Sequence, residues 1–329
     1  MASADPKRLR VAAIDFLNPA PLMWDFEHPP RSRELARRYA LHRTQPARCA
    51  AELQSGEAGL GLIPIAALTP EMAIVPGCTI ASLDCVRSIQ LIVRRRDDGL
   101  TPAADAPSRA AGHPQADAAD ATPGTPGTLD PAAFDRMLAG VQSVAADSAS
   151  RSSVAYAEVL FRRFLGVAPR FFAAPAADPV AMLQAADAAL LIGDPALLAL
   201  ERRQAIEASP GVGPCVWIDL AHQWRVRTGL PWVAAVWAAR PAALADAGLT
   251  PGQLTADLQH SRDAGQEHID DLVVEWAPRI DIPAPTIRSY LTHNIHYTLS
   301  DECIAAIRLF RDYAQEAGIL PALPTLRFL

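Results

Sequence analysis

The order of apolar runs in the first third of the chain predicts strands that alternate with helices. Residues 9–16 (LRVAAIDF), 39–45 (YALHRTQ) and 58–68 (AGLGLIPIAAL) are short apolar runs typical of strands. The segments between them, 31–39 (RSRELARRY) and 46–57 (PARCAAELQSGE), have helical character. This alternation indicates a parallel α/β layer, and TIASLDCVRSIQLIVRRR adds one or two further strands.

The alternation stops at residue 97, where a Pro/Ala/Gly/Asp mixture without apolar periodicity begins. We interpret residues 96–140 as a disordered surface insertion that carries no chemistry. Strand and helix patterns return at GVQSVAAD, which leads into a helix, and continue through PVAMLQAADAALLIGDPALLAL.

This order of elements predicts two α/β lobes rather than one sheet. The first lobe would contain residues 1–95, and the second residues 141–229, after the insertion at 96–140. Residues 230–329 would return the chain to the first lobe through the strand LPWVAAVWAAR and complete it with helices. A ligand would then lie in the cleft between the lobes, where strand ends and helix N-termini meet.

The composition is that of a globular protein, and the length suffices for two ordinary domains or one large one. The 329 residues are half hydrophobic and one-fifth charged, and their formal net charge of −6 argues against a nucleic-acid surface. The five cysteines are scattered without a C-x-x-C pair, which is typical of reduced thiols. Neither a signal peptide nor a bilayer-spanning apolar run is found. We therefore expect a cytoplasmic protein without membrane contact.

Four serines crowd one turn before a helix in VAADSASRSSVAYAEVLFRRFLG, at Ser148, Ser150, Ser152 and Ser153. A nucleophilic serine needs an oriented histidine base, and no G-x-S-x-G elbow or nearby histidine supports one. Serines at a helix N-terminus either cap its backbone N–H groups or help those groups to bind an anion. Capping needs only one serine, so pure capping and an anion site remain equal alternatives.

Two more polar residues follow predicted strands. Asn18, in DFLNPAPL, is either an ordinary turn residue or a neutral amide that faces the cleft. Asp194, in LLIGDPALL, precedes Pro195. Its position favours a helix N-cap over a catalytic carboxylate.

The sequence gives little support to a metal or nucleotide. His293 and His296 share a helix face near Cys303, but no further group has ligand spacing, so a surface or packed pair is favoured. No G-x-G-x-x-G or G-x-x-x-x-G-K-[ST] motif occurs. We expect no metal and no organic cofactor.

Six motifs occur in a characteristic order: FLNPAPL, GLGLIPIAAL, IASLDCVRSIQLIV, DSASRSS, ALLIGDPAL and DLAHQWRVRTGLPWVAAVWAAR. Together with the C-terminal YLTHNIHYTLSDECIAAIRLFRDYAQEAGIL, they resemble the chorismate dehydratases of the futalosine route to menaquinone. The resemblance covers nearly the whole chain except residues 97–140.

The resemblance implies a two-lobed type II periplasmic-binding-protein-like fold and a cofactor-free hydro-lyase. The implied reaction is the dehydration of chorismate to 3-[(1-carboxyvinyl)oxy]benzoate, with chorismate as a small-molecule partner. Two alternatives remain: the sister dihydroxynaphthoate synthase of the same pathway, and a solute-binding protein for a small carboxylate.

The resemblance also assigns site residues. Asn18 matches an asparagine implicated in the reaction, and Ser88, Ser152 and Ser153 match substrate-binding serines. Ser82 and Asp194 are added to the substrate-binding candidates.

This chain departs from the family pattern near the same positions. Phe16 stands where tyrosine is usual, and Asp84 and Cys85 replace a turn that usually contains glycine.

Overall fold

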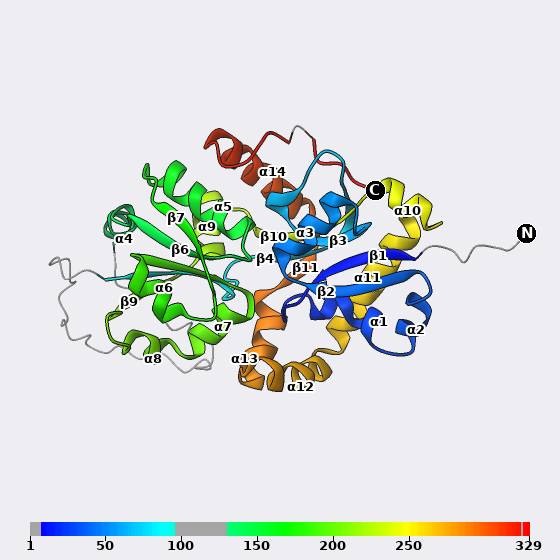
Figure 1. The fold of residues 1–329 in the computed structure, drawn as a ribbon, viewed down its shortest axis with the longest axis horizontal. Coiled ribbons are helices and arrows are strands. Elements are labelled where there is room, and N and C mark those ends of the chain that lie inside the picture. The colour runs from blue at the N-terminus through cyan, green and yellow to red at the C-terminus, as the bar shows by residue number, and fades with distance from the viewer. Residues whose placement is uncertain (1–7, 96–129, 324) are drawn as a thin grey trace, which may run out of the picture.

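Two β-sheets form the cores of two lobes that lie side by side (Figure 1). The computed structural model describes residues 8–95, 130–323 and 325–329. The first sheet has the strand order β11-β4-β10-β3-β1-β2. Its strands are β1 (Leu9–Ile14), β2 (Tyr39–Thr44), β3 (Leu60–Pro64), β4 (Ala73–Ser82), β10 (Trp232–Ala239) and β11 (His296–Thr298).

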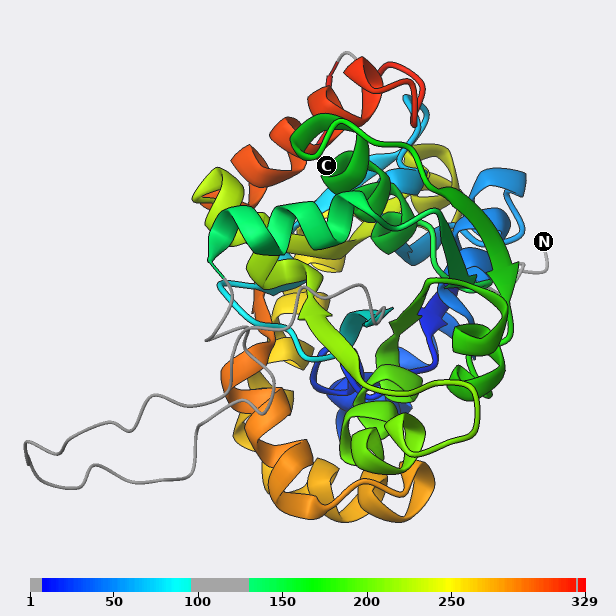
Figure 2. The ribbon, with the colours of Figure 1, turned by 90° about the vertical axis from the view of Figure 1, so that its left-hand side faces the viewer.

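The second sheet has the strand order β7-β6-β8-β5-β9. Its strands are β5 (Ile89–Arg94), β6 (Ser143–Asp147), β7 (Arg170–Ala174), β8 (Ala188–Ile192) and β9 (Cys215–Asp219). Figure 2 looks onto this lobe and shows helices on both faces of its strands. Cover on both faces explains why β8 is a continuous buried run, AALLI, instead of an alternating one.

Helices surround both sheets. Those of the first lobe are α1 (Trp24–Glu27), α2 (Arg31–Leu35), α3 (Pro46–Ser55), α10 (Pro241–Asp246), α11 (Pro251–Glu267), α12 (Ile269–Ile280), α13 (Ala284–Ser289) and α14 (Asp301–Glu316). Those of the second lobe are α4 (Pro131–Ala139), α5 (Ser152–Val159), α6 (Pro179–Ala185), α7 (Gly193–Glu201), α8 (Arg203–Glu207) and α9 (Leu220–Thr228). Single turns complete them: η1 (Ala20–Met23), η2 (Ile65–Ala67), η3 (Leu160–Phe164) and η4 (Tyr290–Asn294). In the described part of the chain, no helix combines the length and apolarity needed to cross a membrane.

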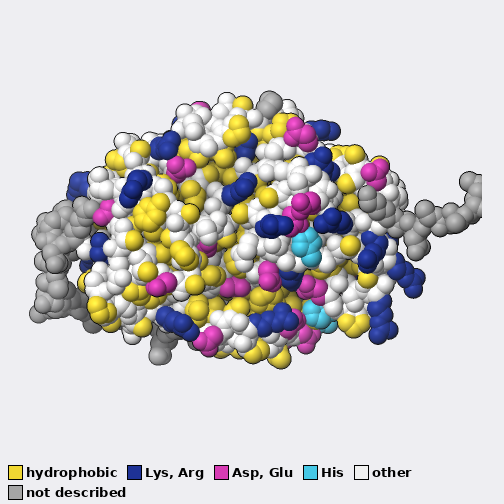
Figure 3. Space-filling model, viewed as in Figure 1, with side chains coloured by type: hydrophobic (Ala, Val, Ile, Leu, Met, Phe, Trp, Pro, Cys, Tyr) yellow, Lys and Arg dark blue, Asp and Glu magenta, His cyan; other side chains and the backbone are white. Residues whose placement is uncertain are grey.

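Charged side chains of both signs are interspersed over the face shown in Figure 3. The formal charge of the whole chain is −6. This face therefore carries no extended field of one sign of the kind that steers a polyanion.

The chain leaves the first lobe earlier than the sequence predicted. We expected residues 1–95 to belong to the first lobe, but β5 lies in the second sheet, between β8 and β9. Both edges of β5 are therefore paired there, and the first crossover between the lobes is the short segment 83–88. The second crossover is equally short, since α9 ends at Thr228 and β10 begins at Trp232.

The predicted insertion at 96–140 also needs a correction at its end. Residues 131–139 form α4, whose apolar residues Phe134 and Leu138 are buried in the core. A helix that contributes two core side chains is a packed element and not an unstructured insertion. The rest of that range, residues 96–129, lies outside the described residues.

An aromatic cluster joins the two lobes beside the second crossover. Tyr156 of α5 stacks on Trp232 of β10, with ring centroids 3.7 Å apart, and on Phe310 of α14, at 4.0 Å. Its hydroxyl donates a hydrogen bond to the backbone carbonyl of Val233, and Trp224 of α9 packs against its edge. Aromatic pairs of this kind add to the free energy gained by burying their area.

Helix α11 packs very closely against the turn that follows β1. Gly265 approaches this turn so closely that a Cβ built on it would lie 2.0 Å from the carbonyl oxygen of Pro21. Nearby, the Ser261 hydroxyl donates to the carbonyl of Leu22 and accepts from the N–H of Asp25. Close packing and buried hydrogen bonds therefore fix the backbone just after Asn18.

We predict that Gly265→Ala destabilises the protein by about 1–3 kcal/mol, the cost of overpacking a tight interface. The contacted atom belongs to the backbone of Pro21 and has little freedom to move. Urea unfolding followed by circular dichroism measures the change. Gly252→Ala on the same helix is the matched control, because its added Cβ meets no atom within 4 Å. An equal loss in both variants would contradict the packing argument.

Candidate functional site

A pocket lies between the two lobes, and the empty space in it, open solvent at its mouth included, is about 480 Å³. Its apolar wall includes Ile14, Phe16 and Ile80 from the first lobe and Ile89 and Ile192 from the second. Its polar groups are Asn18, Ser88 and the turn 150–153. Apolar walls with a few polar groups between them are typical of a small-molecule site.

Asn18 presents an unused acceptor at this cavity. The residue follows β1 and precedes η1. Its side-chain oxygen Oδ1 is shielded from solvent and has no hydrogen-bond partner among the described residues. A buried acceptor without a partner costs about 1–3 kcal/mol. A ligand that donates a hydrogen bond here would remove this cost.

Ser88 also lines the cavity, and both its carbonyl and its hydroxyl accept hydrogen bonds. Its backbone carbonyl accepts a 2.8 Å hydrogen bond from the N–H of Gly193. Its hydroxyl accepts a 2.8 Å hydrogen bond from the hydroxyl of Tyr290. Burial raises the pKa of Tyr290 well above its usual range, and its hydrogen bonds with Ser88 and Asn18 only partly oppose this. Tyr290 thus stays protonated and links Asn18 with Ser88.

The serines of residues 148–153 do not cap α5. Arg151 occupies the N-cap position, and no side chain caps the helix there. Ser152 accepts a 3.1 Å hydrogen bond from the N–H of Ala66, which belongs to the first lobe. The hydroxyl of Ser150 is buried without a partner among the described residues, and Ser153 also lines the cavity. The geometry thus decides against capping, while anion binding stays a prediction.

Arg151 is the only charged residue among the described residues that line the cavity. It lies at the N-terminus of α5, where the helix dipole also favours a negative charge. Our sequence analysis missed it, although it stands between Ser150 and Ser152 in the motif that we singled out. The sequence signal that could have identified it is a single arginine among the serines at the start of a helix.

The two remaining site candidates do not line the cavity. Ser82 is buried at the end of β4, opposite Trp232 of β10. Asp194 lies inside the first turn of α7 and not at its N-cap, which is Ile192. Its carboxylate instead accepts the N–H of Leu17 in the other lobe, at 2.9 and 3.2 Å. The expectation of a capping role for Asp194 was therefore wrong.

Burial makes Asp194 harder to ionise than an exposed aspartate. Burial raises its pKa from 3.8 to about 7, and the negative charge of Asp15 adds to this. The hydrogen bond from Leu17 and the positive charge of Arg43 act in the opposite direction. Because Leu17 immediately precedes Asn18, Asp194 positions the asparagine across the cleft.

Gly193 is needed where the two lobes approach each other. Its φ of +61° lies in the left-handed region, which glycine adopts without a steric cost. A Cβ at this position would lie 2.6 Å from the ring of Phe16. Phe16 therefore packs directly on the backbone of the second lobe and closes one side of the cavity.

A family profile described as "Menaquinone biosynthesis" matches residues 9–110 and 130–316. The match covers most of the chain. The chain belongs to this menaquinone-biosynthesis family. The family part of the resemblance found in the sequence is thereby confirmed.

Solved structures similar to this family member show its fold. Protein AF1704 from Archaeoglobus fulgidus has a TM-score of 0.63 and 13% identity, covering 95% of this chain and 98% of its own. The alkanesulfonate-binding protein SsuA from Xanthomonas axonopodis pv. citri, bound to MOPS, has a TM-score of 0.61 and 14% identity, with coverages of 97% and 96%. The CA3427 product of Candida albicans, described as having the generic periplasmic binding protein fold, has a TM-score of 0.57 and 14% identity, with coverages of 96% and 92%. The predicted periplasmic-binding-protein fold is confirmed.

We predict that Asp194→Asn removes a pH dependence of stability from this menaquinone-biosynthesis protein. Between pH 3.8 and about 7, Asp194 is protonated in the folded state and ionised in the unfolded state. Unfolding then releases a proton, so the free energy of unfolding falls as the pH rises, by at most about 1.4 kcal/mol per pH unit. The amide of the variant keeps an oxygen for Leu17 and cannot ionise.

Urea titrations across this pH range test the prediction. The difference between the free energies of unfolding of wild type and variant should change with pH. Asp246→Asn, at an exposed position on α10, should keep the wild-type slope. A constant difference between wild type and Asp194→Asn would show that Asp194 does not change its protonation on unfolding.

Proposed function

We propose that this protein dehydrates chorismate to 3-[(1-carboxyvinyl)oxy]benzoate in menaquinone biosynthesis, without a metal or organic cofactor. The proposal rests on the family match and on the chemistry of the cavity. Chorismate offers an apolar ring, two carboxylates and one hydroxyl, and the cavity has apolar walls for the ring, an acceptor for the hydroxyl and a cationic, serine-rich turn for a carboxylate.

The observation that carries the proposal is the unpartnered Oδ1 of Asn18. An acceptor needs a donor, and the two ionised carboxylates of chorismate can only accept. The ring hydroxyl is the remaining donor, and it is also the group that leaves. Asn18 would therefore hold the leaving hydroxyl in one orientation.

The turn 150–153 of the cavity suits a carboxylate. Arg151 provides a permanent positive charge, the start of α5 provides backbone N–H groups, and Ser150 and Ser153 provide hydroxyl donors. These groups bind a carboxylate equally well before and during the reaction. They would contribute affinity and position the ring between the apolar walls.

The reaction needs only a small contribution from the protein. A C–H bond and the neighbouring C–OH bond break, a ring double bond forms, and the hydrogen and hydroxyl leave as one water molecule. The product ring is aromatic, so the substrate supplies the thermodynamic drive. What remains for the protein is orientation and exclusion of water, which the apolar walls of Ile14, Phe16 and Ile89 provide.

All five cysteines are free thiols in the structure. Unpaired cysteines are typical of proteins from a reducing compartment. We place the proposed reaction in the cytoplasm on this basis.

Incubation of the pure protein with chorismate, in buffer that contains a chelator and no nucleotide, tests the proposal. Liquid chromatography with mass detection should show 3-[(1-carboxyvinyl)oxy]benzoate formed with multiple turnovers. If chorismate stays intact under these conditions, the proposal is wrong. Activity that appears only after a metal is added would refute its cofactor-free part.

A solute-binding function is the second candidate. The fold is shared with an alkanesulfonate-binding protein that holds MOPS, and a cleft with Arg151 and serines suits small anions in general. A binding protein would take up chorismate, or another carboxylate, in calorimetry and release it unchanged. The turnover assay therefore separates the two functions.

We predict that two substitutions in the cavity affect different kinetic constants. Ser153→Ala removes a contact present in both the ground state and the transition state, so KM should rise while kcat stays nearly constant. One hydrogen bond to a charged group is worth about 1.5–3 kcal/mol, so kcat/KM should fall about ten- to a hundred-fold. Asn18→Ala should instead lower kcat by about 10²-fold, as expected when a preorganised polar group at the reacting atoms is lost.

Steady-state kinetics on both variants measures this split. Ser148→Ala is the matched control, since Ser148 belongs to the same serine-rich segment but is exposed and does not line the cavity. It should leave both constants unchanged. If Asn18→Ala raises KM and keeps kcat, the asparagine only binds substrate and its role in the reaction is refuted.

A further inference from the structure

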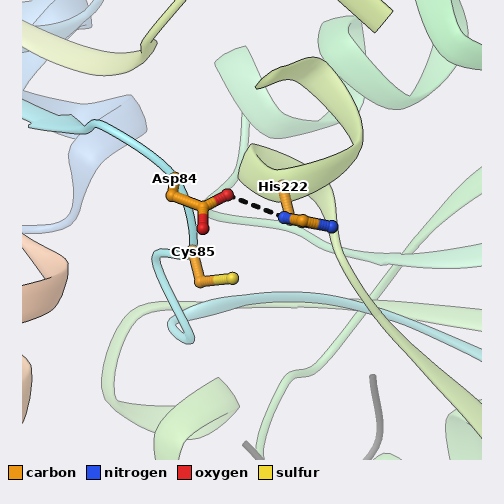
Figure 4. Close-up of side chains that lie close together, drawn as sticks. All are labelled: Asp84, Cys85 and His222. Atoms are coloured by element: carbon orange, nitrogen blue, oxygen red, sulfur yellow. Dashed lines mark hydrogen bonds and ion pairs between the residues drawn. The ribbon is translucent and has the colours of Figure 1, made fainter. Parts of the chain in front are cut away.

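Three potential metal ligands meet at the first crossover, on the segment that joins β4 to β5. Asp84 and Cys85 belong to this segment, and His222 lies in the first turn of α9. One carboxylate oxygen, the Cys85 Sγ and one ring nitrogen of His222 all lie within 4.8 Å of one another. Figure 4 shows Asp84 and His222 pointing toward each other, with the Cys85 thiol on the same side.

Hydrogen bonds hold the backbones that carry two of these ligands, His222 and Cys85. The carboxylate of Asp219 accepts the N–H of His222 and, on the crossover, the N–H of Arg87. The side-chain amide of Asn294 donates to the carbonyl of Cys85 at 3.0 Å. The backbones of His222 and Cys85 are therefore held by contacts that do not involve the ligand side chains. Such support is what a metal site requires of the residues around it.

We propose that Asp84, Cys85 and His222 bind one Zn²⁺ ion. The donor set is a thiolate, an imidazole and a carboxylate, which zinc accepts in tetrahedral sites, and the thiolate disfavours Mg²⁺ and Ca²⁺. Nδ1 of His222 and Oδ1 of Asp84 are now 2.7 Å apart. Two tetrahedral zinc ligands are about 3.3 Å apart. Small side-chain rotations therefore suffice to admit the ion.

The proton balance of binding is simple. The ion replaces the hydrogen that now lies between Nδ1 of His222 and Oδ1 of Asp84. The neutral ring keeps one proton, which moves to Nε2. The thiol of Cys85 loses its proton to solvent and binds as thiolate. A water molecule completes the fourth position.

The site is open to ions from solution. The Asp84 side chain is 63% exposed and that of His222 is 32% exposed. None of the three residues lines the cavity, so the inference does not depend on the proposed chorismate reaction. Bound zinc would tie the crossover to α9 and stabilise the fold by mass action.

Titration of the metal-free full-length chain with Zn²⁺, in competition with a chromophoric chelator, tests the proposal. We expect one ion per chain and a melting temperature that rises with the zinc concentration. Co²⁺ in place of Zn²⁺ should give a thiolate-to-cobalt absorption band, which reports the Cys85 bond directly. Absence of stoichiometric binding would overturn the proposal.

Three variants locate the ion. Cys85→Ser and His222→Gln should each weaken zinc binding at least tenfold, and Cys85→Ser should abolish the cobalt band. Asp84→Asn, at the most exposed ligand, should weaken binding and leave the metal-free melting temperature close to that of the wild type. His293→Gln, at an exposed histidine outside the cluster, is the matched control and should bind zinc as the wild type does. Undiminished binding in Cys85→Ser, or equal losses in Cys85→Ser and His293→Gln, would contradict the assignment.

Discussion

The buried carboxylate of Asp219 is the interaction on which the arrangement of the two lobes depends. It accepts backbone N–H groups of Ala221 and His222 at the start of α9, and that of Arg87 on the first crossover at 2.6 Å. Burial raises its pKa, while these hydrogen bonds favour the charged form. Arg87 has a φ of +62°, which is unfavourable for a residue with a side chain. The bond to Asp219 offsets that cost and fixes the direction in which the chain enters the second sheet.

The fixed first crossover, residues 83–88, also positions the residues on both sides of the cavity. Ser88, the next residue after Arg87, meets Gly193 through its carbonyl and Tyr290 through its hydroxyl. Because Gly193 has no side chain, the ring of Phe16 can pack on its backbone. The carboxylate of the neighbouring Asp194 accepts a hydrogen bond from the N–H of Leu17. Each contact joins residues far apart in the sequence. The cavity is thus defined by long-range hydrogen bonds more than by any one motif.

The sequence predicted the fold class because apolar periodicity is a local property. It also named Asn18, Ser88 and Ser153, which do line the cavity. It could not assign β5 to the second sheet, since an apolar run does not reveal its pairing partners. It likewise missed the contact between Asp194 and Leu17, whose positions are 177 residues apart. Such contacts depend on how the lobes pack, and a single sequence carries no record of that packing.

The aromatic cluster around Tyr156 has a practical consequence. Trp232 begins β10 directly after the second crossover, and its ring stacks on a tyrosine from the other lobe. Indole emission depends on the polarity and the neighbours of the ring, so any opening of the lobes would alter the fluorescence of Trp232. The protein therefore contains its own optical reporter of domain motion, at the place where the two halves of the molecule are joined.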